Sequence, residues 1–216
     1  TLRHSYSGRS LQTLAGCGQS AWKKIPLPVA GIKHAHAPYC YRCPFNATPD
    51  KCGFECAQDI EELILTETGG EIAAFMAETI IGSGGFIVPP KGYFEVATKI
   101  AKKYGGLYIA DEVQTAWGRT GEHWWGVQHY DVKPDIMVSA KGMGNGAPVA
   151  MTIATPEVAD KFPGITFATF GGNPVSMAAT LATMQVIEEQ QTLDNCKTTG
   201  AYLGERFKQL KEKHPL

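Results

Sequence analysis

Between residues 70 and 141 the chain alternates between short apolar runs and an amphipathic segment. The run IAAFMAETI at 72–80 is apolar and bounded by glycines, which is typical of a buried strand. At 89–106, apolar residues recur every three or four positions between a Pro pair and a Gly pair, which predicts an amphipathic helix. Three further apolar runs predict strands at 106–112, 135–141 and 148–154. The last of these strands is expected to pair with the one before it.

On both sides of this region the pattern is looser. Before it, the pattern predicts an edge strand at 2–6, an irregular stretch at 16–56 and a helix at 59–67. After it, the pattern predicts two final helices with polar outer faces, at 177–190 and 200–214. Strands that alternate with helices indicate an α/β fold with a mainly parallel sheet covered by helices. In such folds, ligands bind at the carboxyl ends of the strands.

The composition favours a globular protein that binds a small molecule or another chain. Of its 216 residues 44% are apolar, and 20 basic and 21 acidic residues give a net charge of −1 without a long run of either sign. Nothing therefore points to nucleic acid or to a membrane surface, and no apolar stretch is long enough to span a bilayer. Six cysteines in a chain of this size favour a reducing, intracellular compartment, cytoplasmic or mitochondrial.

Two of the predicted strands end in charged residues. Asp111 and Glu112 close one and Lys141 closes another, so their side chains can reach one pocket above the sheet. An ammonium group at the end of a buried strand loses its proton easily, which makes Lys141 a nucleophile for aldehydes. Pyridoxal 5'-phosphate needs such a lysine, and it needs an Asp beside its pyridine nitrogen. Taken alone, Lys141 also fits a surface lysine, and Asp111 with Glu112 fits a solvated turn.

Three segments together resemble the signature of the class III aminotransferases, which are fold-type I pyridoxal-phosphate enzymes. They are IADEVQTAWGRTG at 109–121, DIMVSAKGMGNGAPVA at 135–150 and TFGGNP at 169–174, in the family's order and at roughly its spacing. The resemblance runs from about Leu2 to Glu189 and is nearest to the alanine–glyoxylate and ω-amino-acid aminotransferases.

The resemblance implies a domain organisation. Residues 1–189 are expected to form the large cofactor-binding domain, incomplete at its amino terminus, with 16–56 as an irregular insertion that contains cysteines. Residues 190–216 are expected to form a helix that leads to a small carboxy-terminal domain. The family chain is much longer, so its cofactor-phosphate loop and its carboxylate-binding Arg are expected outside this fragment.

The family's roles around the cofactor ring correspond to four residues here. Lys141 matches the lysine that holds pyridoxal phosphate as a Schiff base, and Asp111 matches the partner of the pyridine nitrogen. Gln114 matches the residue near the phenolic oxygen, and Val113 the residue that packs on one ring face. Lys141 and Asp111 are therefore the expected catalytic residues.

Three more residues match positions at the rim of the family's site. Tyr6 matches the aromatic residue that stacks on the other ring face, and Glu78 matches the acid that supports the site from the preceding strand end. Thr169 matches the threonine that reaches the phosphate of the neighbouring subunit's cofactor. The resemblance thus implies a homodimer with a shared active site.

The chain departs from the family pattern beside Glu78 and Tyr6. Thr79 and Ile81 replace the Pro and the Gln of the family's Glu-Pro-Ile-Gln-Gly, and Ser7 replaces the usual His. A second Glu that some ω-amino-acid enzymes carry just after this motif is absent. Its absence favours an alanine-type substrate over an ornithine-type one.

The leading hypothesis is transamination between an alanine-like or ω-amino acid and a keto acid such as glyoxylate or pyruvate. Lys141 would shuttle a proton between the substrate α-carbon and the cofactor, and Asp111 would stabilise the developing charge. An aminomutase, a racemase or a phospholyase would use the same two residues. A hypothesis from another class is a truncated, inactive product or a zinc-stabilised interaction module.

The zinc hypothesis rests on a cluster of cysteines. Four thiols could bind a structural zinc, those of Cys40, Cys43, Cys52 and Cys56. Two, eight and three residues lie between successive cysteines. Reduced or paired thiols without metal are the alternative, because the central spacer is short and the family requires no metal. His34 and His36 are interpreted as solvated loop residues. Trp117, Trp124 and Trp125 are interpreted as loop packing or subunit interface.

Overall fold

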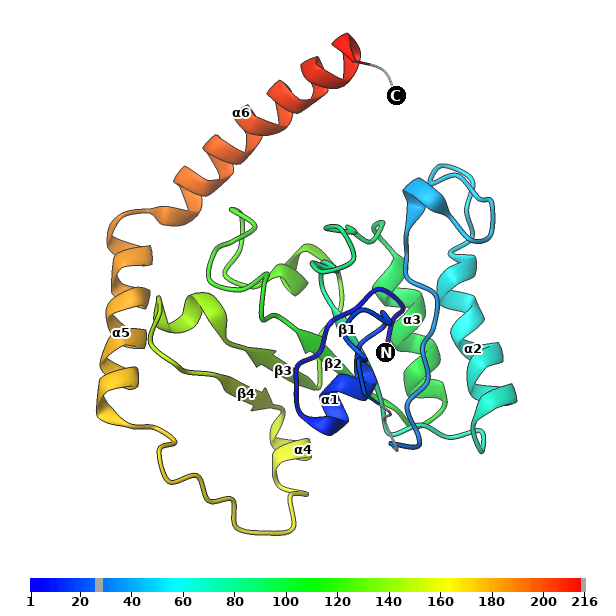
Figure 1. Cartoon of the computed structure of the whole chain (residues 1–216), viewed down its shortest axis with the longest axis horizontal. Coiled ribbons are helices and arrows are strands. Elements are labelled where there is room, and N and C mark those ends of the chain that lie inside the picture. Colours follow the sequence, from blue (N-terminus) through cyan, green and yellow to red (C-terminus); the bar gives the residue numbers. More distant parts are fainter. Residues whose placement is uncertain (26–28, 215–216) are drawn as a thin grey trace. The chain divides into compact units, whose positions relative to one another are not determined.

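The computed structural model describes residues 1–25 and 29–214 and contains a four-stranded sheet (Figure 1). The strands are β1 (Ala74–Glu78), β2 (Leu107–Asp111), β3 (Ile136–Ser139) and β4 (Met151–Ala154), and they neighbour one another in that order. β1 pairs with β2, and β2 with β3, in parallel. The four expected strands, the pairing of the fourth with the third and the mainly parallel α/β fold are confirmed.

Six α-helices and three short 3-10 helices lie within the described residues. The α-helices are α1 (Leu11–Gly16), α2 (Glu55–Glu67), α3 (Tyr93–Lys103), α4 (Pro156–Ala159), α5 (Pro174–Glu189) and α6 (Thr192–Lys213). The 3-10 helices are η1 (Cys40–Arg42), η2 (Gly126–His129) and η3 (Lys141–Gly144). α2, α3, α5 and α6 confirm the four helices expected from the sequence. None of the described helices is both long and apolar enough to cross a membrane.

The amino-terminal segment differs from the sequence prediction. The edge strand expected at 2–6 is wrong, because Leu2 forms only an isolated parallel bridge with Ala35. The backbone of His4 adopts a left-handed conformation, with a φ of 68°, which ends the extended run. Helix α1 was not expected. Ser10 caps it, since the Ser10 side chain accepts a hydrogen bond from Thr13 N.

Within 16–25 and 29–56 the chain is irregular apart from the last residue of α1, the isolated bridge at Ala35, η1 and the start of α2, as the sequence pattern predicted. Its residues 26–28 lie outside the described part of the chain. Residues 215–216 of the segment expected at 190–216 also lie outside it.

The chain divides into two compact units. The sheet unit comprises Thr1–Glu112, Tyr130–Val138 and Thr152–Gly164, and the helical unit comprises Val113–His129, Ser139–Met151 and Ile165–Leu216.

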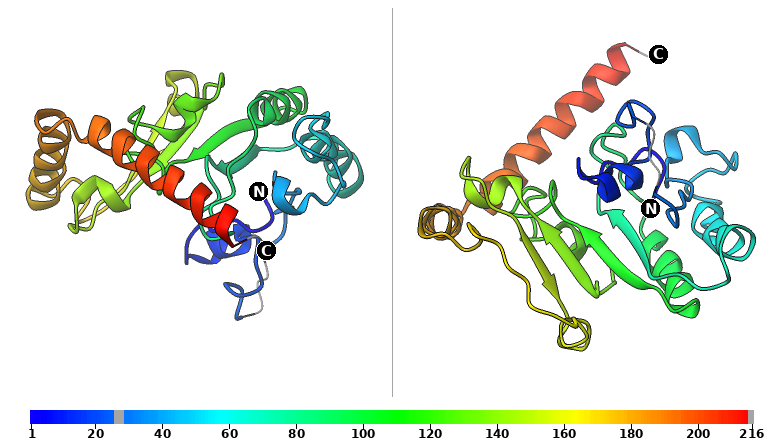
Figure 2. Two further views of the ribbon diagram at one scale, coloured as in Figure 1. Left: turned by 90° about the horizontal axis from the view of Figure 1, so that it is seen from above. Right: turned by 60° about the horizontal axis from the view of Figure 1, so that its bottom comes forward.

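The core of the sheet unit lies between its strands and two helices. Phe94 of α3 packs on Tyr108 of β2 with ring centroids 5.7 Å apart, and Phe75 of β1 stacks on Tyr108 at 6.0 Å. Ala97 and Ala101 are fully buried on the same helix. α2 packs alongside α3, and Figure 2 shows these two helices in cyan and green. Because burial of each such side chain contributes about 1.5–3 kcal/mol, this layer holds α3 against β1 and β2.

In the helical unit, α5 packs against η3 and α6. Asn173 caps α5, since its side-chain oxygen accepts a hydrogen bond from Ser176 N at 2.9 Å, and Pro174 takes the first helical position. Ser176 is buried, and its hydroxyl donates to the carbonyl oxygen of Pro148 at 3.0 Å. α5 therefore anchors the loop that follows η3.

Candidate active site

Three acidic residues are buried where β1 and β2 end. Glu78 is the last residue of β1 and lies in register with Asp111, the last residue of β2. Glu112 follows directly, and the three residues are 6%, 7% and 0% exposed. Burying a carboxylate costs free energy unless partners compensate for its lost hydration. A concentration of such groups at the carboxyl end of a parallel sheet is typical of a functional site.

Glu78 ties the amino-terminal segment to this edge. Its carboxylate accepts hydrogen bonds from two backbone N–H groups, that of Tyr6 at 2.8 Å and that of Gly82 at 2.9 Å. The half-buried ring of Tyr6 stands edge-to-face against Trp22, with ring centroids 4.8 Å apart. The fold thus brings together Tyr6 and Glu78, two candidate residues that lie 72 positions apart in the sequence.

Thr79 gives a physical reason for one departure from the family pattern. Its hydroxyl donates to the carboxylate of Glu112 at 2.6 Å. A proline at this position would offer no donor, so Thr79 supplies a hydrogen bond to a fully buried carboxylate. The N–H of Glu112 donates in turn to the carbonyl oxygen of Val138 at 2.9 Å. Glu112 therefore holds the end of β2 to β3 on one side and to the residue after β1 on the other.

Lys141 lies after β3 and not on it. β3 ends at Ser139, and Lys141 is the first residue of η3, with a left-handed φ of 43°. The expectation that Lys141 closes the strand is therefore wrong. Left-handed backbone at a non-glycine residue costs about 1–3 kcal/mol and clusters at functional sites. Lys141 is exposed, and it takes part in none of the ion pairs found within residues 1–25 and 29–214.

Trp117 supports the turn that carries Lys141. Its indole Nε1 donates to the buried hydroxyl of Ser139 at 2.9 Å. Trp124 and Trp125 pack edge-to-face on Trp117, with ring centroids 6.1 Å and 5.3 Å away. These ring contacts agree with the loop packing expected for the cluster, whereas spacing along the chain gives no signal for the bond to Ser139.

The remaining candidate residues lie on two loops of the helical unit. Val113 and Gln114 are half-buried in the turn that follows β2. Thr169 is exposed, in a segment whose apolar side chains are exposed as well. Ile165 is 97% exposed and Phe167 is 87% exposed. Such an apolar surface is typical of a segment that another chain covers.

β2 and β3 are neighbouring parallel strands. β2 therefore ends in a buried acid, Asp111, and β3 is followed by a turn that carries the exposed Lys141. The model of the family described as aminotransferase class III matches residues 1–216. The chain belongs to the class III aminotransferases.

Three relatives illustrate this membership. The mitochondrial alanine–glyoxylate aminotransferase 2 homolog 2 of Arabidopsis thaliana is 41% identical, over 100% of this class III chain and 44% of its own. The leucine/methionine racemase of Thermococcus litoralis is 38% identical, and the match covers 87% of this chain and 43% of the racemase. The structure of an (S)-enantioselective ω-transaminase from Thermomicrobium roseum matches with a TM-score of 0.89 and 35% identity. This match covers 98% of this chain and 49% of the ω-transaminase. The chain thus spans about half the length of these relatives.

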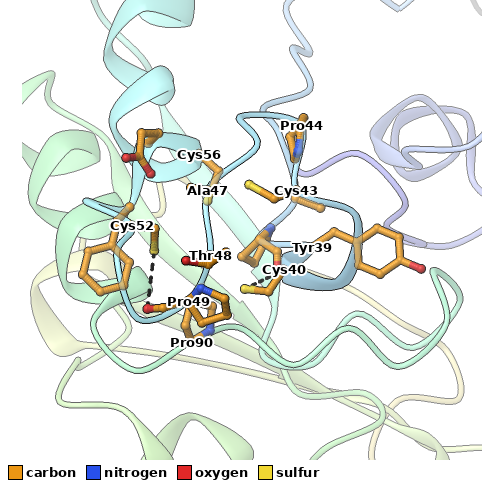
Figure 3. Close-up of a pocket in the computed structure, with 14 residues that line it drawn as sticks. Tyr39, Cys40, Cys43, Pro44, Ala47, Thr48, Pro49, Cys52, Cys56 and Pro90 are labelled. Carbon is orange, nitrogen blue, oxygen red and sulfur yellow. Dashed lines mark hydrogen bonds between the residues drawn. The ribbon is translucent and has the colours of Figure 1, made fainter. Parts of the chain in front are cut away.

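The sheet unit of this class III aminotransferase also holds the cysteine cluster. Cys40, Cys43, Cys52 and Cys56 are free thiols that line one cavity (Figure 3). Burial raises the pKa of the Cys56 thiol to about 12, and the neighbouring thiols of Cys43 and Cys40 add to the effect. Burial likewise raises the pKa of Cys40.

His34 and His36 are partly buried and hydrogen-bonded, which corrects their interpretation as solvated residues. The Nε2 atom of His34 lies 3.0 Å from the carbonyl oxygen of Cys17, and the Nδ1 atom of His36 lies 3.3 Å from the guanidinium of Arg3. Burial lowers the pKa of both imidazoles.

Replacing Glu78 with Gln is expected to destabilise this class III chain. A Gln side chain has a single acceptor oxygen, so one of the N–H groups of Tyr6 and Gly82 loses its acceptor. We expect the free energy of unfolding in urea to fall by about 1–3 kcal/mol. Glu71→Gln, which neutralises an exposed glutamate just before β1, is the matched control. Unchanged stability in Glu78→Gln would contradict the role given to this carboxylate.

Trp117→Phe is expected to loosen the turn that carries Lys141. The substitution keeps an aromatic ring but removes the donor to Ser139, whose buried hydroxyl then lacks that partner. The cost should be about 1–3 kcal/mol, and amide hydrogen exchange at Lys141–Gly144 should become faster. Trp125→Phe, a change of the same size in the same cluster, should leave exchange in η3 as it is. Equal exchange in both variants would show that the indole does not brace this turn.

Proposed function

We propose that the chain carries part of a pyridoxal-phosphate site that transfers the amino group of an alanine-like or ω-amino acid to a keto acid such as glyoxylate or pyruvate. One observation carries the proposal. Asp111 is buried at the end of β2, and β3, which pairs with β2 in parallel, leads into Lys141. Asp111 lies opposite Val138 in the register, so the two strands end at the same edge of the sheet.

The chemistry of these residues fits pyridoxal phosphate. A buried carboxylate is a strong acceptor for a protonated pyridine nitrogen, and Asp111 is such a carboxylate. Lys141 offers an exposed amine that can hold the aldehyde carbon as a Schiff base. Gln114 would donate to the phenolic oxygen, and Val113 and Tyr6 would cover the two faces of the ring.

The catalytic work is divided between Asp111 and Lys141. When bound, pyridoxal phosphate supplies a ring that withdraws electrons from the substrate α-carbon. Asp111 would keep the pyridine nitrogen protonated, because a negative charge beside that nitrogen favours its protonated form. Lys141 would act as the acid–base group that takes the proton from the substrate α-carbon and holds it for return.

We propose that Thr169 acts across a homodimer. The exposed apolar side chains around Thr169, those of Ile165, Phe167 and Phe170, support a second copy covering this segment. The hydroxyl of Thr169 would then donate to the phosphate of the cofactor bound by the partner. The reciprocal contact would complete the second site.

We also propose an intracellular location, cytoplasmic or mitochondrial. All six cysteines are free thiols, which supports a reducing compartment. The Arabidopsis relative is named as mitochondrial.

A racemase is the second candidate, because the chain is 38% identical to a leucine/methionine racemase. The same two residues would serve it. Lys141 would remove the α-proton, and the proton would return to the opposite face of the same carbon.

The test is to supply the whole protein with pyridoxal phosphate, L-alanine and glyoxylate. Transamination predicts pyruvate and glycine in equal amounts, separated and measured by chromatography. If glyoxylate is left out, formation of D-alanine with no release of pyruvate would favour the racemase. A protein that binds the cofactor and forms neither set of products would contradict transamination from alanine to glyoxylate and racemisation of alanine.

A further inference from the structure

Four thiols surround one small cavity in the sheet unit (Figure 3). The cavity has a volume of about 20 Å³, and prolines, alanines and a phenylalanine provide much of its remaining lining. A space of this size holds one water molecule or one ion and nothing larger. Because the lining is mostly apolar, the sulfur atoms are its main potential ligands.

The thiols come from two segments of the chain. Cys40 is the first residue of η1 and Cys43 follows its end, so this pair is carried by a single tight turn. Cys52 precedes α2, and Cys56 lies in the first turn of that helix. Structural zinc sites take two ligands from each of two such arms.

The thiols have no strong alternative partners. None is in a disulfide. The Sγ atom of Cys40 lies 3.9 Å from the carbonyl oxygen of Pro38, and that of Cys52 lies 4.0 Å from the carbonyl oxygen of Pro49. Contacts of this length are weak, so they oppose rotation of the Cys40 and Cys52 side chains only slightly.

Such a rotation is required. At the usual zinc–sulfur distance of about 2.3 Å, tetrahedral geometry places the sulfurs roughly 3.8 Å apart. Within the described residues, the group of potential ligands whose atoms already lie within 4.8 Å of one another is Glu122, His123 and His129. That group is the poorer site, because Glu122 is exposed and its carboxylate is 3.0 Å from the ammonium of Lys197. A cation would have to displace this lysine.

We propose that Cys40, Cys43, Cys52 and Cys56 bind one Zn²⁺ in a closed, structural site. Four thiolates select zinc over hard cations, and a full set of protein ligands leaves no position for a substrate. The thiol protons pass to the solvent on binding. The ion would join η1 to α2, which packs on α3, and would thereby fasten an irregular stretch to the layer that covers β1 and β2. This site is independent of the proposed transamination.

The test is the zinc content of the purified, fully reduced protein. After Zn²⁺ is added and loosely bound ions are removed by gel filtration, elemental mass spectrometry should find one zinc per chain. Co²⁺ in its place should give the near-ultraviolet charge-transfer band of thiolates bound to the metal. The double variant Cys43→Ser/Cys56→Ser should retain no zinc. Cys196→Ser, which removes a thiol outside the cluster, should retain it.

Zinc should also raise the melting temperature of the parent and of Cys196→Ser, but not that of the double variant. A reduced parent protein that retains no zinc overturns the proposal. So does a cobalt spectrum without the thiolate band, and this outcome does not depend on how any variant folds. Zinc kept by the double variant and lost by His123→Gln overturns it as well, because the ion would then belong to the Glu122 group.

Discussion

Replacing Lys141 with Arg should abolish transamination by the whole protein. Arginine keeps the positive charge and much of the length, but its guanidinium stays protonated and cannot attack an aldehyde. The proton transfers at the substrate α-carbon also lose their acid–base group. We therefore expect kcat to fall by at least about 10²–10⁴-fold. The visible absorbance of cofactor joined to a lysine should be lost at the same time.

The matched control is Lys161→Arg, which makes the same change at another exposed lysine. Its kcat and its absorbance should equal those of the parent. A Lys141→Arg protein that keeps kcat within a few-fold of the parent would contradict the role proposed for Lys141.

Asp111→Asn is expected to impair the reaction far more than the fold. Asparagine has the shape of aspartate but no charge, so it cannot favour a proton on the pyridine nitrogen. By comparison with other single electrostatic groups in active sites, kcat should fall by about 10²–10³-fold. Urea denaturation should show a change in stability too small to account for that loss.

Glu112→Gln separates this specific role from a general effect of charge at the edge of the sheet. Glu112 is adjacent in sequence and fully buried, and a Gln there still offers an oxygen to the hydroxyl of Thr79. Its kcat should fall by less than about tenfold, an effect below about 1.4 kcal/mol. Equal losses in the two variants would mean that Asp111 has no privileged contact with the cofactor.

The strands could be predicted from sequence because burial imposes a simple pattern on them. The runs around Phe75, Tyr108 and Val138 are apolar, which is typical of strands in a parallel sheet. The edge strand at 2–6 failed because an extended run of residues does not reveal the positive φ of His4. α1 was missed because six residues provide too little periodicity.

The candidate site was only partly predictable. The types and order of Asp111 and Lys141 indicate their chemistry, but the two residues that separate Lys141 from the end of β3 depend on how the chain turns. The bonds from Trp117 to Ser139 and from Thr79 to Glu112 join residues 22 and 33 positions apart. Spacing rules describe neighbours on one helix or strand, so only the folded chain shows such contacts.

The central claim is that Lys141 forms the covalent link to pyridoxal phosphate. Borohydride reduction of the protein with its cofactor, followed by proteolysis and mass spectrometry, tests it directly. We expect one stably modified peptide, with the cofactor mass on Lys141. Modification of a different lysine, or none in a protein that has bound the cofactor, would contradict it.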